Sequence, residues 1–209
     1  MPRLLFLLAL LISAGPAQAA DLPIVSKVEL QPLAAQAKRV ADALEYLGNP
    51  LPEADRKALQ EAARDKEGVA AIQKVLDRHC LAGIRITAKD RPEVLAGPAR
   101  PELAEQGWRL FLVKVINPIE ADKLILRAAS PNAAPLHRRS TSDPAPKVQP
   151  VNVVDKRFLD LQMFDSNPMT ATLSGLEVEY RILQVYCRDA GRKIASLGFE
   201  LLQPSNRPR

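Results

Sequence analysis

Hydrophobic positions in the first part of the chain follow the helical period. In residues 31–47 the apolar positions lie three or four apart: Leu33, Ala37, Val40, Leu44 and Leu47. This spacing predicts an amphipathic helix that ends at Gly48, and similar patterns predict helices over about residues 52–65 and 69–78. These helices contain few large apolar residues, so we expect the helical segment 20–80 to pack on the rest of the chain.

From residue 84 onward the pattern changes to the alternation that is typical of β-strands. Strands are predicted over residues 84–87, 108–117, 123–129, 158–163, 176–187 and 193–202, with a Pro-rich connection at 90–107. Short connections predict one hairpin between the second and third strands and another between the last two. The predicted fold class is α+β, with short N-terminal helices packed on an antiparallel, immunoglobulin-like β-sandwich of residues 81–203.

Two segments show no regular period. Residues 130–150 contain five prolines, which predicts a mobile loop, and residues 204–209 predict a frayed tail. The strand at 176–187 has a different irregularity, because its apolar phase reverses after Ile182. Since strand faces alternate strictly, the reversal predicts a β-bulge or a switch between sheets. Before the reversal, Glu177, Glu179 and Arg181 share the face that we expect to be solvated.

The first nineteen residues have the pattern of a cleavable signal peptide. Arg3 supplies the positive charge, residues 4–12 are apolar, and Ala17 and Ala19 are the small residues before the expected cleavage point. The apolar run is too short for a membrane anchor, which needs about 20 residues. We therefore expect an exported protein, periplasmic or extracellular, with no integral membrane span.

Charge argues against one class of partner. The chain of 209 residues carries a formal net charge of +5, and its basic residues are mixed with 24 acidic ones. Nucleic-acid-binding proteins more often show a basic stripe with stacking aromatic residues. The dense basic stretch at 137–139 is typical of a solvated loop. We expect no nucleic-acid partner.

The two cysteines, Cys80 and Cys187, leave two alternatives open. Export would expose them to oxidants, which permits a disulfide between them. A disulfide also needs Cα atoms about 4.4–6.8 Å apart, which the sequence does not define. Both cysteines lie among apolar residues, where free thiols pack equally well.

No catalytic, cofactor or metal motif stands out. Asp77, His79 and Cys80 cluster at a predicted helix end, but a closed zinc site needs four ligands at defined spacings. Ser174 has the context of a turn residue, and the pair Glu177 and Glu179 that of a solvated strand face. Glycine-rich phosphate loops are absent. Trp108, which precedes an apolar strand, is expected to plug the core or an edge.

Several short blocks carry a family resemblance. They are His79 to Ile86, Gly107 to Val115, Ser130 to Ala133, Phe158 to Leu161, Leu173 to Arg181 and Cys187 to Arg192. Together they resemble an N-terminal region of large secreted bacterial metallohydrolases of the polymerase-and-histidinol-phosphatase (PHP) class. The resemblance implies a non-catalytic accessory domain, because these blocks are structural. A His-rich catalytic domain follows in such proteins, whereas this chain has two histidines.

These observations favour an exported, non-catalytic accessory or protein-interaction module of the cell envelope. We expect a protein partner, no cofactor and no enzymatic activity. Two alternatives stay open: a hydrolase with an unrecognised metal site near Asp77 and His79, and a truncated remnant of a larger secreted metallohydrolase.

Overall fold

The computed structural model describes residues 21–87, 92–133, 137–138, 147–148 and 156–204. The predicted signal peptide, most of the predicted loop 130–150 and all of the predicted tail except Pro204 lie outside these residues. Within the loop, the short strands β5 (His137–Arg138) and β6 (Lys147–Val148) pair with one another. A 3-10 turn, η1, covers Pro131–Ala133.

The helical period predicted the three helices correctly. They are α1 (Leu30–Tyr46), α2 (Glu53–Ala62) and α3 (Gly68–Asp77). Four of the five predicted apolar positions of α1 are buried, and Gly48 ends the helix with φ +75°. The Gly48 and Asn49 amides donate to the carbonyls of Glu45 and Leu44 at 3.0 and 2.9 Å. This pattern is the Schellman motif, which glycine favours because it lacks a Cβ atom.

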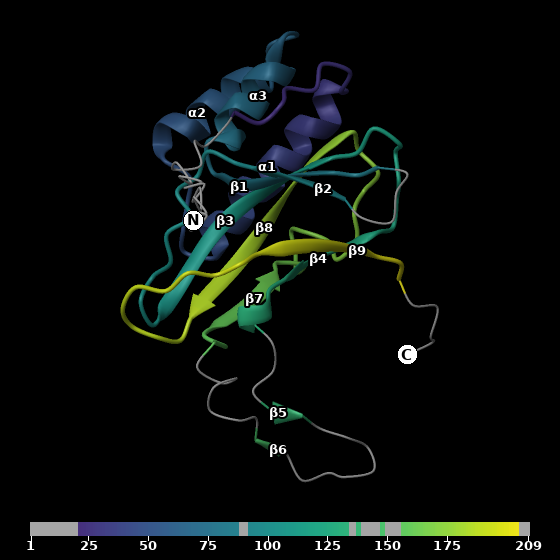
Figure 1. The fold of residues 1–209 in the computed structure, drawn as a ribbon. Helices are drawn as coiled ribbons and strands as arrows, with labels where there is room; N and C mark the ends of the chain where they lie inside the picture. Colours follow the sequence, from purple (N-terminus) through teal and green to yellow (C-terminus); the bar gives the residue numbers. More distant parts are fainter. Residues whose placement is uncertain (1–20, 88–91, 134–136, 139–146, 149–155, 205–209) are drawn as a thin grey trace, which may run out of the picture.

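The main sheet has five strands in the order β2-β1-β3-β8-β7 (Figure 1). They are β1 (Cys80–Arg85), β2 (Glu93–Ala96), β3 (Gly107–Ile116), β7 (Leu159–Met163) and β8 (Val178–Cys187). Strand β1 runs parallel to β3, and the other pairs are antiparallel. The sheet is therefore mixed, and the prediction of a wholly antiparallel arrangement is wrong. Parallel pairing becomes available because β2 and the segment 97–106 return the chain to the start of β3.

Neither predicted hairpin forms. Strand β4 (Ile125–Ala129) pairs with β9 (Gly198–Leu202) in a separate two-stranded sheet. Both long edges of β8 are already occupied, by β3 on one side and β7 on the other. The chain therefore leaves the sheet after β8 and crosses its face before it reaches β4.

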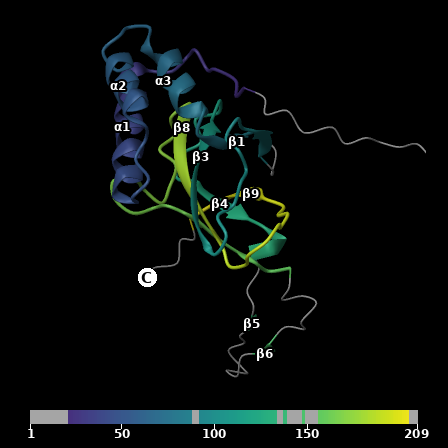
Figure 2. The ribbon, with the colours of Figure 1, turned by 90° about the vertical axis from the view of Figure 1, so that its left-hand side faces the viewer.

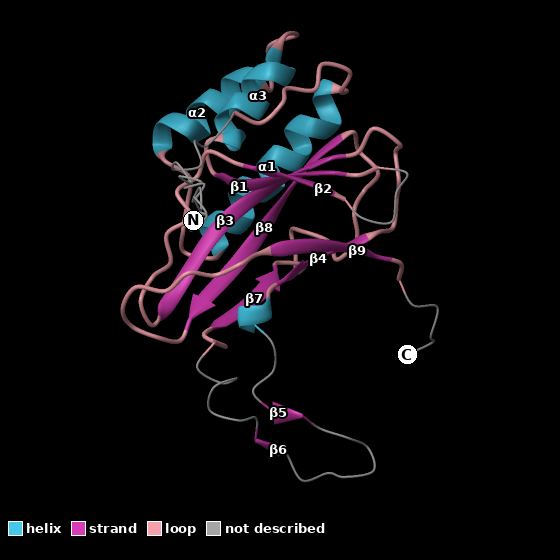
Figure 3. Ribbon diagram, viewed as in Figure 1, coloured by secondary structure: helices cyan, strands magenta, loops and turns pink. Residues whose placement is uncertain are grey.

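The elements form three layers, with helices on one face of the main sheet and the β4–β9 pair on the other (Figures 2 and 3). One core cluster joins α1, α2 and α3 to the sheet and includes Leu33, Ile72 and Ile182. A second cluster fills the opposite face and includes Val113 and Phe199. The helical segment thus shares a core with the β-strands, as we expected from its small apolar content. No helix among the described residues is long and apolar enough to cross a membrane.

Strand β8 explains the reversed phase without a bulge. Its register with β3 is continuous from Val178 to Cys187. Tyr180 and Ile182 contact the helical core, whereas Leu183 and Val185 contact the core of the opposite face. The predicted bulge is wrong because this strand is covered on both sides, by helices near its start and by the β4–β9 layer near its end. Each half of the strand therefore has its own apolar face.

Candidate functional site

A buried ion pair connects the helical layer to the sheet. Lys114 of β3 is fully buried, and its Nζ lies 2.8 Å from Oδ2 of Asp77 at the end of α3. The Tyr180 hydroxyl donates to the other carboxylate oxygen of Asp77 at 2.7 Å. Burial raises the pKa of Asp77, although Lys114 and Tyr180 act in the opposite direction. These contacts place three charged or polar groups at a helix–sheet interface, where the Asp77 carboxylate accepts hydrogen bonds from both Lys114 and Tyr180.

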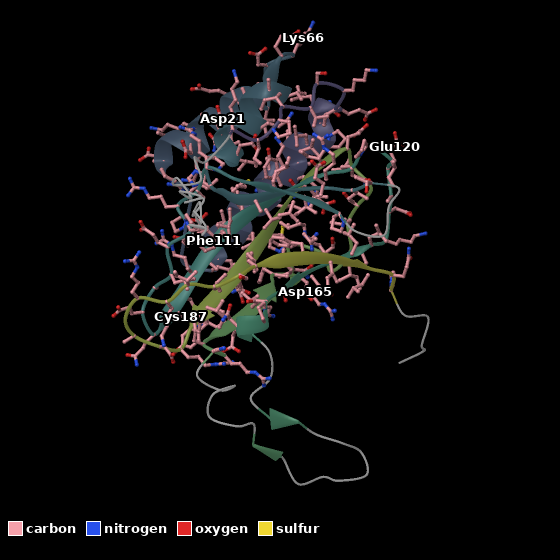
Figure 4. The ribbon with its side chains drawn as sticks, viewed as in Figure 1. Asp21, Lys66, Phe111, Glu120, Asp165 and Cys187 are labelled. Atoms are coloured by element: carbon pink, nitrogen blue, oxygen red, sulfur yellow. The ribbon has the colours of Figure 1, made fainter. Side chains whose placement is uncertain are left out.

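The first described residues extend the same network. Lys114 Nζ donates to the Pro23 carbonyl at 2.9 Å, and Gln73 of α3 exchanges two hydrogen bonds with the main chain of Val25. Leu22 is buried against Gly83 of β1. Asp21, which precedes this segment, lies beside the helical layer in Figure 4. The network therefore has a structural use, which is to hold residues 22–25 against the fold.

The predicted cluster of Asp77, His79 and Cys80 does not form one site. His79 Nε2 lies 2.7 Å from Asp55 of α2, whereas Asp77 points into the network with Lys114. The Arg78 guanidinium also donates to Asp55, at 2.9 Å. Among the residues that the structure describes, no group of three His, Cys, Asp or Glu side chains is arranged to hold a metal ion. Asp55 thus joins the end of α3 to α2.

Both cysteines are free and buried, so the disulfide considered from the sequence is not formed. They belong to core clusters on opposite faces of the sheet, Cys80 beneath the helices and Cys187 beneath the second layer. Burial raises the pKa of the Cys80 thiol well above its usual value, so this group stays protonated at neutral pH.

We expect a thiol reagent such as dithionitrobenzoate to modify neither cysteine in the folded protein. Two thiols per chain should react after denaturation, because unfolding exposes both side chains. A spectrophotometric titration of native and denatured protein, without reductant, measures these numbers. Zero reactive thiols in denaturant, with two after reduction, would instead demonstrate a disulfide.

The polar face predicted for the start of β8 is buried. Glu179 and Arg181 are only 3% and 2% exposed. The Glu179 carboxylate accepts hydrogen bonds from the amide and hydroxyl of Ser174, each 2.8 Å, and from Arg181 at 3.0 Å. Arg181 also donates to the Thr170 carbonyl. The segment 170–174 folds over these side chains, which the strand pattern alone could not indicate.

A pocket of about 1130 Å³ lies on the face of the sheet opposite the helices. Its apolar lining comes from all five strands of the main sheet and from the segment before β9, and includes Ala82, Leu95, Phe111, Leu161, Val185 and Leu197. Phe111 and Cys187 are labelled on β3 and β8 in Figure 4. The charged lining residues are Glu102, Glu105, Arg192 and Lys193. Glu105 accepts from the Gly191 amide at 2.9 Å, and Lys193 pairs with Asp189 at 3.0 Å, so two of these charges already have partners.

Strand β2 forms one border of this pocket and one edge of the main sheet. The Gly97 amide donates to the Leu81 carbonyl at 2.9 Å. The alternation of an antiparallel pair then directs the main-chain groups of Leu95 toward β1, and those of Val94 and Ala96 away from it. Within the described part of the chain, these outward groups have no backbone partner. The edge therefore offers two amides and two carbonyls beside an apolar pocket.

Sequence reasoning missed β2 and assigned its residues to a Pro-rich connection. The segment Glu93–Ala96 is only four residues long and lies between Pro92 and Pro98, which favours an irregular connection. An available signal was the strand-forming Val94, followed by the apolar Leu95, in a segment bounded by Pro92 and Gly97. Such a run is too short to predict a strand by periodicity.

The fold and the pocket define an α+β protein with a mixed five-stranded sheet and an unpaired sheet edge beside an apolar pocket. No family model, no curated protein and no solved structure matches the chain. The resemblance to the N-terminal region of PHP-class metallohydrolases therefore stays a prediction.

Proposed function

We propose that this protein is an exported, non-catalytic interaction module that binds an extended segment of a partner protein along β2. The observation that carries the proposal is the outward-facing main chain of Val94 and Ala96 at the border of the apolar pocket. An added strand would satisfy these groups and bring alternate side chains over the pocket. The signal-peptide pattern of residues 1–19 supports a partner in the cell envelope, periplasmic or extracellular.

The chemistry of the pocket supports binding rather than turnover. Its lining is largely apolar, and two of its four charged residues, Glu105 and Lys193, are engaged in contacts that shape the turn after β8. A general acid or base needs a side chain that is free to reach a substrate. The β4–β9 pair across from the main sheet is consistent with the sandwich interpretation, and the immunoglobulin-like topology stays a prediction.

We expect peptides selected from a random display library on the purified protein to carry apolar residues at alternate positions. Binding should slow hydrogen exchange at the Val94 and Ala96 amides, which point away from β1. Val94→Lys should weaken binding about tenfold or more, because lysine on an edge strand opposes strand addition. Exchange measured by NMR and affinity measured by calorimetry test these outcomes.

The matched control is Ile119→Lys, which makes the same charge change at a residue that is 52% exposed and does not line the pocket. This variant should bind the selected peptides as the original protein does. Selected peptides that leave the Val94 and Ala96 amides unprotected would overturn the proposal, as would equal losses in the two lysine variants.

A further inference from the structure

The helix-facing side of the sheet is not covered along its whole length. Trp108, the second residue of β3, is 55% exposed, so the expectation that it plugs the core or an edge is wrong. It lies on the face that carries Leu112 and Lys114, because strand faces alternate. The helical core includes Leu112 of β3 and the first half of β8, from Val178 to Ile182. The start of β3 pairs with the end of β8, near Cys187, and this end of the two strands extends past the helices (Figures 1 and 4).

Strand register gives this uncovered surface a defined composition. Trp108 lies opposite Tyr186, which lies opposite Asp160, and these three residues form one row across β3, β8 and β7. Leu110, Gln184 and Gln162 form the next row in the same way. Residues opposite one another in a sheet project from the same face. We call these six residues the sheet platform.

The platform combines aromatic faces with free amide groups. The rings of Trp108 and Tyr186 lie with their centroids 5.1 Å apart. Gln162 is exposed and Gln184 is half-buried, and within the described residues neither side-chain amide has a hydrogen-bond partner. Each amide offers two donors and one acceptor oxygen. Asp160 contributes a half-exposed carboxylate, and Nε of Arg188 donates a hydrogen bond to its Oδ2 at 3.0 Å.

We propose that the sheet platform is a binding site for a neutral oligosaccharide. The face of a pyranose ring presents weakly positive C–H groups, which the negative face of an aromatic ring attracts. Its equatorial hydroxyls both donate and accept, as the two amides and the carboxylate require. The two rows span three neighbouring strands, β3, β8 and β7, so several sugar units of one chain could contact them.

The charge of the platform favours a neutral sugar over a nucleic acid, although the bases of a nucleic acid would also stack on aromatic side chains. None of the six platform residues is cationic, and the neighbouring Arg188 is already paired with Asp160. Nucleic-acid binding depends on Lys and Arg side chains that neutralise phosphates. The inference does not rest on the proposed function, because β2 and the pocket lie elsewhere on the sheet.

Trp108 is the only tryptophan in the chain, so its fluorescence reports directly on this site. We expect cellohexaose or chitohexaose, at millimolar concentration, to shift the emission saturably and to move the NMR signals of the Gln162 and Gln184 amides. Calorimetry should show an affinity loss of about tenfold or more for Trp108→Ala. Trp108→Phe should retain most of the affinity, because it keeps an aromatic face.

Two control variants make the test specific. Ile119→Ala changes an exposed apolar residue that is outside the platform and should bind the sugar normally, as should Val94→Lys at β2. Three results would overturn the inference: neither hexasaccharide binds, Trp108→Ala binds as well as the original protein, or decathymidylate binds more tightly and displaces the sugar. Absence of peptide binding in the original protein, with intact sugar binding, would count against the proposed function alone.

Discussion

Replacing Lys114 by methionine lowers the free energy of unfolding by about 3–5 kcal/mol at neutral pH, because it leaves Asp77 buried without its cation. The loss should be smaller below pH 3.8. The folded-state pKa of Asp77 is raised above this value, so the carboxyl group is protonated there in both the folded and the unfolded chain. Urea denaturation at pH 3 and pH 7 measures the two losses.

Two further variants decide the cause of this loss. Lys57→Met breaks an exposed helical ion pair with Glu53 and should cost no more than about 0.5 kcal/mol. The double variant Asp77→Leu/Lys114→Met should recover most of the stability, because no isolated charge is then buried. If Lys114→Met lowers the free energy of unfolding by as little as Lys57→Met does, the buried ion pair does not hold the helical layer to the sheet.

A second large effect is expected for Gly97→Ala, just after β2. An added Cβ atom would lie 2.1 Å from the Cys80 carbonyl oxygen and 2.9 Å from the Leu81 carbonyl carbon, both main-chain atoms of β1. Main-chain atoms cannot turn aside as a flexible side chain can, so β2 must shift. We expect a loss of about 1–3 kcal/mol or more in unfolding free energy.

The same variant also tests the use of β2. A shift of β2 in Gly97→Ala should weaken the binding of the display-selected peptides. This loss should be seen even under conditions where circular dichroism shows that the protein stays folded. Gly198→Ala in β9 is the control, because its nearest neighbour would be 3.9 Å from the new Cβ atom. Replacing a strand glycine there should leave stability unchanged or raise it by about 0.5–1 kcal/mol. Equal effects at the two glycines would contradict the close approach of residue 97 to β1.

The sequence by itself determined the local structure. The spacing from Leu33 to Leu44 and the glycine at 48 defined α1, because a helix and its cap depend on contacts within a few residues. The strict alternation in β7 and the largely apolar run in β3 likewise located strands, because both patterns depend on the side chains of the strand itself. Elements of this kind are predicted well where the hydrophobic period of a segment and the turn residues at its ends indicate the same structure.

Only the tertiary structure decided which strands meet and which side chains are covered. An apolar run indicates that a strand is buried but does not identify its neighbours. The sequence therefore predicted that β9 pairs with β8, which precedes it in the chain, whereas β9 pairs with β4. Glu179 and Trp108 reversed their expected exposure, because cover comes from segments distant in the sequence. The unpaired edge at β2 and the sheet platform arise for the same reason: each depends on where other layers end, which no local pattern encodes.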